Sequence, residues 1–274
     1  MPQRHVVLPD RGPLLVSTDL HGNGDDFAAL GAVFSTLGPD AHWVMLGDLV
    51  HGPDDRARRD EAHLYDYDDA SAELVRAVAK LRRDHPTRFH FVLGNHDHGH
   101  VGGVHTAKFH RDEVAHLEGS LTPEDLATMR ALFNSALLAV AAPCGVLLTH
   151  GAPDESLTSL DALDALDLTG RTNTPEQRRV LGSILRAYGQ PRERAEAMLA
   201  QLRATSGLPL HVVIHGHDRD ESGLFTEAGD QVCPVIFGAP REKKRYVLLD
   251  LAASYRSVDD LRDGHEIRHL HAAR

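Results

Sequence analysis

The sequence predicts an α/β fold in which strands and helices alternate along the chain. Short apolar runs alternate with stretches of helical periodicity, which is the pattern typical of that fold class. In addition, five short motifs rich in Asp, His and Asn each directly follow a predicted strand. The carboxyl ends of strands form the edge at which open α/β sheets bind ligands, so the sequence predicts a functional site there.

Apolar runs bounded by turn-forming residues predict the strands. They are expected at Leu14–Ser17, Trp43–Leu46, Phe89–Leu93, Val146–Thr149, Val212–Ile214, Val235–Phe237 and Tyr246–Leu251. Helical periodicity is clearest at Asp26–Leu37, Ala70–Arg83, Thr174–Tyr188 and Pro191–Thr205. Pro123 and Pro175 stand near the starts of predicted helices, where the missing backbone N–H costs nothing.

The length of the chain allows one α/β domain or two small ones, and we favour one. A chain of 274 residues can bury a full α/β core, and we expect a single domain over residues 1–274. Residues 52–69 are charged and rich in turn formers, so we expect them to form a flap. Residues 151–205 begin with regularly spaced leucines and aspartates over 151–171, and we expect them to form a helical cap over the site.

Composition limits the cellular compartments and the binding partners that we expect. The two cysteines, Cys144 and Cys233, are too few for a disulfide framework, and the first 15 residues lack the apolar core of a signal peptide; we therefore expect a cytoplasmic protein. No run of about 18 apolar residues predicts a membrane span. A formal charge of −11 argues against nucleic acid as the main partner, because non-specific binding needs a basic surface. The sequence does not indicate an oligomeric state.

The first two motifs supply carboxylates and a histidine. Asp19 and His21 lie two residues apart after the strand Leu14–Ser17, so in an extended segment they point the same way and can bind one cation. Asp48 follows the strand Trp43–Leu46, and its two oxygens are free to bridge a pair of metals. Each motif alone has an ordinary structural explanation, since an aspartate after a strand is often a helix N-cap.

The other three motifs add amide and imidazole groups. Asn95 offers an amide oxygen as a hard ligand and leaves the neighbouring His96 free. His150 and His217 follow the next two motif-bearing strands, and either one alone could simply be a buried histidine. All five motifs in this order after strands are not explained by chance, and their oxygen and nitrogen donors without thiolates suit Mn, Fe or Zn.

These residues and blocks resemble the calcineurin-like metallophosphoesterase superfamily, and more narrowly its phosphoprotein phosphatase and diadenosine tetraphosphatase-like branch. Val235–Pro240 also resembles a block of that branch, and the likeness covers roughly residues 13–251. The resemblance implies a sandwich of two mixed sheets flanked by helices, with a dinuclear metal site at the carboxyl ends of the strands. It implies six ligands: Asp19, His21 and Asp48 for one divalent ion, and Asp48, Asn95, His150 and His217 for the other. Manganese is favoured, with iron or zinc as alternatives.

The resemblance also implies that His96 donates a proton to the leaving group. At the position where the branch has an aspartate that orients this histidine, the present chain has His51. Asp97 and His51 are therefore both candidates for setting the tautomer of His96. The phosphate-binding arginine that follows in the branch is missing, and three residues are candidates to replace it: Arg241, which is favoured, Arg219 and Arg171.

The function implied is metal-dependent hydrolysis of phosphomonoesters, by direct attack of a hydroxide that bridges the two metals. The expected substrates are phosphoproteins or small phosphate esters and nucleotides. Leu49-Val50 and Gly52-Pro53 favour an alternative, the hydrolysis of dinucleoside polyphosphates such as diadenosine tetraphosphate. A further alternative is a non-catalytic metal-binding scaffold. We expect the histidine-rich loop from His98 to His110 to be solvated, with a third metal or a substrate contact as the alternative.

Overall fold

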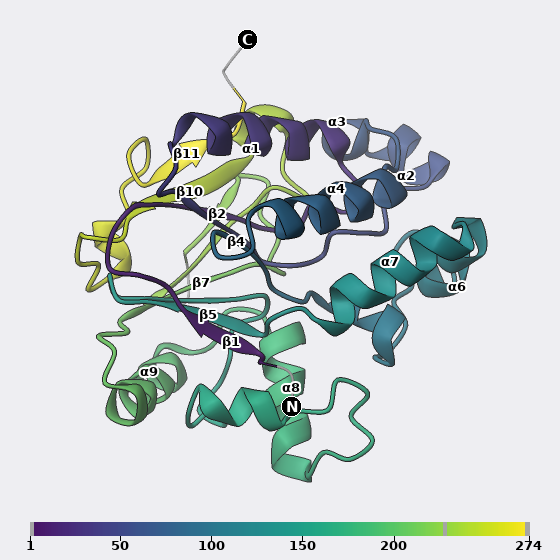
Figure 1. Cartoon of the computed structure of the whole chain (residues 1–274). Coiled ribbons are helices and arrows are strands. Elements are labelled where there is room, and N and C mark those ends of the chain that lie inside the picture. The colour runs from purple at the N-terminus through teal and green to yellow at the C-terminus, as the bar shows by residue number, and fades with distance from the viewer. Residues whose placement is uncertain (1–2, 227–228, 272–274) are drawn as a thin grey trace.

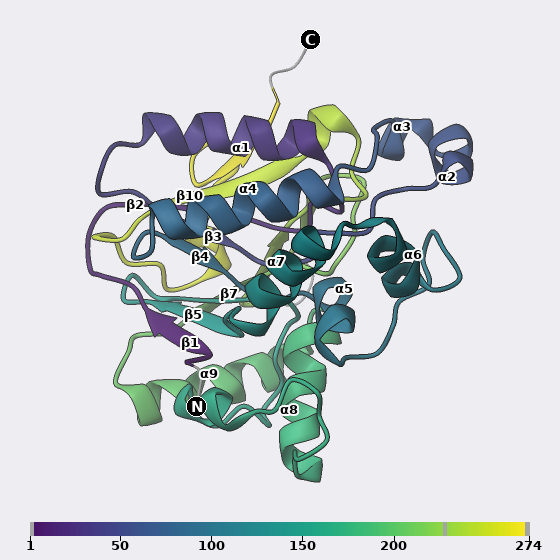
Figure 2. The ribbon, with the colours of Figure 1, turned by 45° about the vertical axis from the view of Figure 1, so that its right-hand side comes forward.

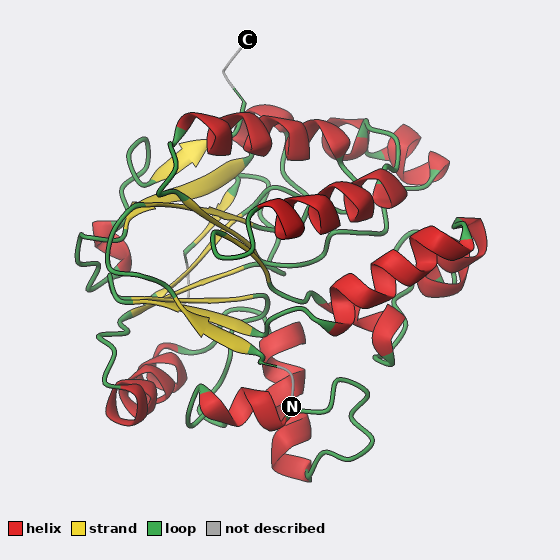
Figure 3. Cartoon of the chain, in the orientation of Figure 1, coloured by secondary structure: helices red, strands yellow, loops and turns green. Residues whose placement is uncertain are grey.

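The computed structural model describes residues 3–226 and 229–271. Two β-sheets face each other, and helices cover their outer faces, so that the molecule is a four-layer sandwich (Figures 1 and 3). Both sheets are mixed. The predicted fold class is therefore confirmed.

The first sheet has five strands in the order β11-β10-β2-β3-β4. Strands β2 (Pro13–Ser17), β3 (His42–Met45) and β4 (Phe89–Phe91) run parallel to one another. Strand β10 (Arg245–Asp250) is antiparallel to both β2 and β11 (Ile267–His269). The carboxyl ends of β2, β3 and β4 therefore share one edge.

The second sheet has six strands in the order β1-β5-β6-β7-β9-β8. Its parallel centre consists of β6 (Val146–Thr149), β7 (Val212–His215) and β9 (Gln231–Pro234). The flanking strands are β1 (His5–Val7), β5 (Ala139–Ala142) and β8 (Leu224–Phe225). Three of the five motifs follow the parallel strands of the first sheet, and the other two follow those of the second.

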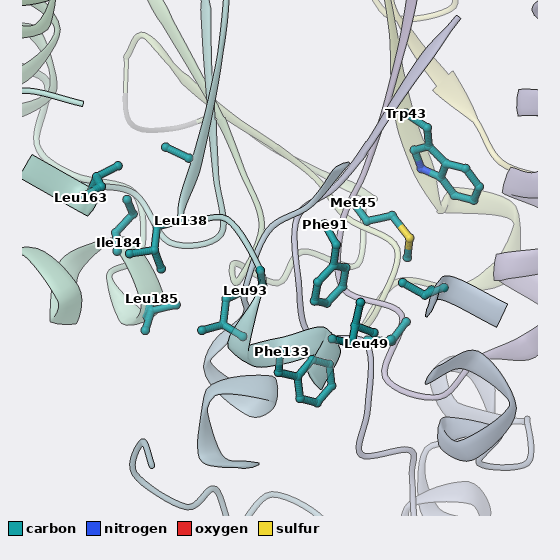
Figure 4. Close-up of a cluster of buried hydrophobic side chains, with 14 of the residues drawn as sticks. Trp43, Met45, Leu49, Phe91, Leu93, Phe133, Leu138, Leu163, Ile184 and Leu185 are labelled. Atoms are coloured by element: carbon teal, nitrogen blue, oxygen red, sulfur yellow. The ribbon is translucent and has the colours of Figure 1, made fainter. Parts of the chain in front are cut away.

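Alternation along each strand divides the core between two interfaces. In β3, Val44 packs in the cluster between the two sheets, whereas Trp43 and Met45 pack in the cluster under the helices. Figure 4 shows this second cluster, in which Met45 lies beside Phe91 and Trp43 lies further along the same strand. Because both faces of the strands are buried, they read as continuous apolar runs in the sequence.

The helices flank both sheets (Figure 2). Helices α1 (Gly24–Thr36), α4 (Ser71–Asp84) and α7 (Pro123–Asn134) lie on the side of the first sheet, and α8 (Pro175–Arg186) and α9 (Arg192–Ser206) lie on the side of the second. Pro123 and Pro175 occupy the first turns of α7 and α8, as predicted. The remaining helical segments are α2 (Asp55–Asp60), α3 (Ala62–Tyr65), α5 (Asn95–His98), α6 (Glu113–Ser120) and the 3-10 turns Gly99–Val101, Asp161–Ala165, Arg241–Lys243 and Val258–Asp260. Within the described ranges, no helix is long and apolar enough to cross a bilayer.

The predicted strand at Val235–Phe237 is wrong. Strand β9 ends at Pro234, and the chain then turns through Gly238, whose φ is +80°. Phe237 is buried against Tyr65 in a small aromatic cluster instead of lying in a sheet. An apolar run indicates that its residues are buried, and here the buried residues lie in a loop and not in a strand.

The two segments that interrupt the alternation have different structures. Residues 52–69 form α2 and α3, and Tyr65 packs on Phe237. Residues 151–205 begin with turns and a 3-10 helix and continue as α8 and α9. The regularly spaced leucines, among them Leu157 and Leu163, are buried in the large core cluster. Closure of either segment over the site stays a prediction.

Candidate active site

The loops that follow five strands meet at one place and bring the six predicted ligands together. They stand after β2 (Asp19 and His21), β3 (Asp48), β4 (Asn95), β6 (His150) and β7 (His217). The backbone N–H groups of Leu20 and His21 both donate to the carbonyl of Asp48, at 3.0 and 2.9 Å. Across the second sheet, Gly216 N–H donates to the carbonyl of His150 at 2.8 Å.

The backbone of these loops is strained. His21, Asp48, His51 and His217 have positive φ values of 44°, 50°, 73° and 70°, and they are the non-glycine residues with positive φ in the described part of the chain. A non-glycine residue in this region costs about 1–3 kcal/mol, so the surrounding contacts must hold it in place. Such strain clusters at functional sites because the side chains must point in fixed directions.

Two motif glycines allow the loops to approach each other. A Cβ on Gly94 would lie 2.1 Å from the backbone nitrogen of Asp48, and a Cβ on Gly47 would lie 2.3 Å from the nitrogen of Gly94. These distances are far below van der Waals contact. The Gly-Asp and Gly-Asn-His motifs therefore need their glycines because the two loops pack backbone against backbone.

Asp48 lies between two histidines. Its Oδ2 is 3.4 Å from Nε2 of His21, and its Oδ1 is 3.5 Å from Nε2 of His150. Both separations exceed an ordinary N–H···O hydrogen bond. Two ligand atoms that are each about 2.1 Å from one cation stand roughly 3.0–3.4 Å apart, so this arrangement suits a cation on each side of Asp48.

The hydrogen bonds of the two histidines support this interpretation. Nδ1 of His150 is 2.6 Å from the carbonyl of Leu46, and Nδ1 of His21 is 3.3 Å from the carbonyl of His51. A carbonyl only accepts, so each histidine carries its proton on Nδ1 when neutral. Each Nε2 then directs a lone pair at a carboxylate oxygen of Asp48. Cations bound between these atoms would remove the repulsion, and carbonyl partners of this kind orient metal-binding histidines.

The other predicted ligands complete two groups. Oδ1 of Asn95 lies 3.0 Å from Nε2 of His150, and the side chain of Asp19 accepts the backbone N–H of His217 at 3.1 Å. The donor atoms of Asp48, His150 and His217 lie within 4.8 Å of one another. Burial lowers the pKa of His217 to about 3, which favours the neutral imidazole that a metal requires.

His96 lies beside this centre. Its backbone N–H donates to Oδ1 of Asp48 at 2.9 Å, and its side chain lines the same pocket as Asp48 and His21. Nδ1 of His96 is 3.0 Å from Nδ1 of His51 and 3.2 Å from Oγ1 of Thr106. Asp97, the other candidate partner, accepts the backbone N–H groups of Leu49 and Gly94, at 3.0 Å each, and thereby ties the two motif loops together.

One of the three predicted arginines reaches the pocket. Arg219 lines it, and its guanidinium carbon lies 5.6 Å from the ring centroid of Phe237. Arg241 lies in a separate pocket, where it is 3.9 Å from Asp25. Arg171 is exposed and does not line the pocket at the metal ligands.

Sequence reasoning missed three residues around the site. The Nζ of Lys108 is buried over Phe237, 3.7 Å from the ring centroid, without a hydrogen-bond partner among the described residues; burial and nearby Arg219 lower the pKa of Lys108 to about 6. The exposed ring of Tyr188 stacks at 4.8 Å on the predicted ligand His217. The third is Glu113, whose side chain is buried near His96. None of the three stands in a motif, so only their approach in space reveals them.

Comparison with known proteins agrees with this geometry. The calcineurin-like phosphoesterase family matches residues 12–221. No curated protein sequence matches the chain. A Saccharomyces cerevisiae protein serine/threonine phosphatase with similarity to human phosphatase PP5 superposes with a TM-score of 0.61 and 17% identity, over 91% of this chain and 76% of that one. A cold-active protein-tyrosine phosphatase of a psychrophilic Shewanella species superposes with a TM-score of 0.55 and 16% identity, over 92% of this chain and 78% of that one. At these identities the two structures show a shared fold.

Proposed function

Because the chain belongs to the calcineurin-like phosphoesterase family and is therefore a phosphoric ester hydrolase, we propose that it hydrolyses phosphomonoesters with two divalent metal ions. The ligands in this proposal are Asp19, His21, Asp48, Asn95, His150 and His217. The observation that carries it is the position of Asp48, whose carboxylate oxygens lie 3.4 Å from Nε2 of His21 and 3.5 Å from Nε2 of His150. Two cations there supply a shared water of lowered pKa and offset the charge of the phosphoryl oxygens.

The side chains around the ligands have separate tasks in this proposal. His96 donates a proton to the leaving oxygen, a role worth about 10²–10⁴ in rate. Arg219 binds the phosphoryl oxygens, because a guanidinium offers paired donors. The amine of Lys108 lies over the same ring. A bound phosphoryl group supplies the anionic partner that its buried Nζ lacks among the described residues, and so favours the protonated amine.

In this proposal, the donor atoms support the choice of metal and the cysteines support the cellular location. The oxygen and nitrogen donors favour manganese, with iron or zinc as alternatives. Cys144 and Cys233 are both buried free thiols, which suits the reducing cytoplasm. The net charge of −11 favours phosphorylated substrates held at the metal centre over extended nucleic acid.

One observation favours the alternative substrate, a dinucleoside polyphosphate. Tyr188 is 62% exposed although it stacks on His217 at the edge of the pocket. An exposed aromatic ring beside a phosphate site can stack a nucleobase, and such stacking contributes about 1–3 kcal/mol. A phosphopeptide would not need it.

The test starts from metal-free protein reconstituted with manganese. We expect two bound ions per chain by elemental analysis and metal-dependent hydrolysis of 4-nitrophenyl phosphate, with phosphopeptides and diadenosine tetraphosphate assayed in parallel. Asp48→Asn should lose bound metal and activity together, whereas Asp84→Asn at the end of α4 should keep both. Full activity in Asp48→Asn, or no metal in the wild type, would refute the proposal.

A further inference from the structure

Glu113 is a buried carboxylate beside the proposed proton donor. It is the first residue of α6 and is 1% exposed. Oε1 accepts the backbone N–H of Phe109 at 2.9 Å. Oε2 has no hydrogen-bond partner among the described residues, yet it lies 3.3 Å from Nδ1 of His96 and 3.7 Å from Nδ1 of His51.

A buried carboxylate needs a positive charge nearby. Leaving a charged group without a partner in the interior costs several kcal/mol, so such groups are paired in folded proteins. The nearest cationic candidates to Oε2 of Glu113 are the imidazoles of His96 and His51, and His96 is the closer.

His51 can orient His96 but does not balance its charge. Nε2 of His51 lies 3.0 Å from Nε2 of His100, whose Nδ1 lies 3.1 Å from Oε1 of Glu118. Since Glu118 accepts, His100 donates from Nδ1, and His51 donates from Nε2 to His100. Nδ1 of His51 is then an acceptor for the N–H on Nδ1 of His96. This neutral chain orients the ring of His96, and Glu113 adds a carboxylate oxygen 3.3 Å from its Nδ1.

We propose that Glu113 is the positioning residue of His96. Its Oε2 approaches Nδ1 of His96 on the same nitrogen that His51 contacts, although Glu113 stands 62 residues further along the chain than His51. With Nδ1–H held by His51 and Glu113, Nε2–H is left to face the substrate. As the P–O bond breaks, its electron pair leaves with the ester oxygen, the proton of Nε2 moves to that oxygen, and His96 becomes neutral.

This inference rests on the proposed function and specifies its substrates. Alkyl phosphates, such as those of serine and threonine, release a basic alkoxide as the leaving group, and its departure needs the proton of His96. Activated aryl phosphates release a weakly basic aryloxide, which departs without that proton. Glu113 should therefore matter for alkyl esters and for aryl esters with poor leaving groups.

The experiment compares Glu113→Gln with Glu124→Gln, the same substitution at an exposed position in the first turn of α7, in manganese-loaded protein. We expect Glu113→Gln to lower kcat/KM for phenyl phosphate and a phosphoserine peptide about 10- to 100-fold and to change that for 2,4-dinitrophenyl phosphate less than about threefold. Metal content by elemental analysis and the affinity for inorganic phosphate by calorimetry should stay unchanged. Glu124→Gln should resemble the wild type. Adding Glu113→Gln to His96→Ala should cause no further loss, because both act through one proton.

Several results would overturn the inference. An equal loss of kcat/KM on substrates with good and poor leaving groups would mean that Glu113 only supports the fold. No loss on either kind of substrate would mean that Glu113 has no part in the reaction. A third metal equivalent that disappears in Glu113→Gln would make Glu113 a ligand. If Glu113→Gln does not fold, Glu113→Asp keeps the charge and should retain the leaving-group dependence of the wild type, and an altered dependence would contradict the role. A wild type that hydrolyses no ester at all would refute the proposed function instead.

Discussion

Replacing Asp19 by asparagine should change stability in opposite directions with and without metal. Asp19 is 5% exposed and lies close to Asp48, another buried carboxylate. Burial, with a smaller contribution from Asp48, raises the pKa of Asp19 from 3.8 to about 7. Without metal, an ionised Asp19 is therefore unfavourable in the folded state. An asparagine removes this charge and still accepts the backbone N–H of His217.

The shift in pKa sets the size and the pH range of the effect. The folded state binds the proton of Asp19 more tightly than the unfolded chain, so metal-free protein loses stability as the pH rises from about 4 to about 7 and loses no more above that. At about 1.4 kcal/mol per pH unit, the upper limit is roughly 4 kcal/mol. We expect about 1–3 kcal/mol, within this upper limit. For a chain of this size, that raises Tm by roughly 2–10 °C.

The assay is thermal unfolding of wild type and Asp19→Asn at pH 4, 6 and 8, in chelator and in excess manganese. In chelator, the variant should match the wild type at pH 4 and be more stable at pH 8. In manganese the order should reverse, because the metal stabilises the protein in proportion to the logarithm of its affinity and the variant lacks one ligand. If the variant is less stable than the wild type in chelator at pH 8, or if manganese stabilises both equally, the assignment of Asp19 as a buried metal ligand is wrong.

Three further substitutions test separate parts of the site. His96→Ala should keep both metals and lose about 10²–10⁴ in kcat on phenyl phosphate; loss of metal by elemental analysis would make it a ligand. Arg219→Met should raise the dissociation constant of inorganic phosphate about tenfold or more, and Arg241→Met should leave it unchanged, as measured by calorimetry; equal effects would contradict the placement of Arg219 at the phosphoryl group. Gly94→Ala should lower the free energy of chemical unfolding by at least about 1–3 kcal/mol and weaken metal binding, because its Cβ would meet the backbone of Asp48. An unchanged free energy of unfolding would mean that the two loops are not packed this closely.

The polar residues at the ends of strands were predictable because sequence and topology agree there. Asp19, Asp48 and Asn95 each follow an apolar run, and parallel strands bring their carboxyl ends to one edge. His150 and His217 follow the same rule in the second sheet. The spacing along the chain thus predicted the six residues that meet. Their roles as ligands remain part of the proposal.

The candidate substrate residues were less predictable. The sequence favoured Arg241, but that arginine lies in a separate pocket beside Asp25, and Arg219 lines the pocket at the proposed metal ligands. Arginine side chains are long, and position along the chain says little about where a guanidinium ends. The predicted strand at Val235–Phe237 failed for a related reason, because apolar character reports burial without saying what covers the residue.

The sequence by itself determined the fold class, the order of the strands that carry the motifs and the identity of the six polar residues that meet at their ends. These follow from local patterns, namely apolar runs, the polar residues after them, and the glycines that close approach requires. Only the tertiary structure decided that Glu113, Lys108 and Tyr188 stand beside the centre. They come from loops and helix ends whose positions depend on packing between distant segments, and no short-range pattern encodes such packing.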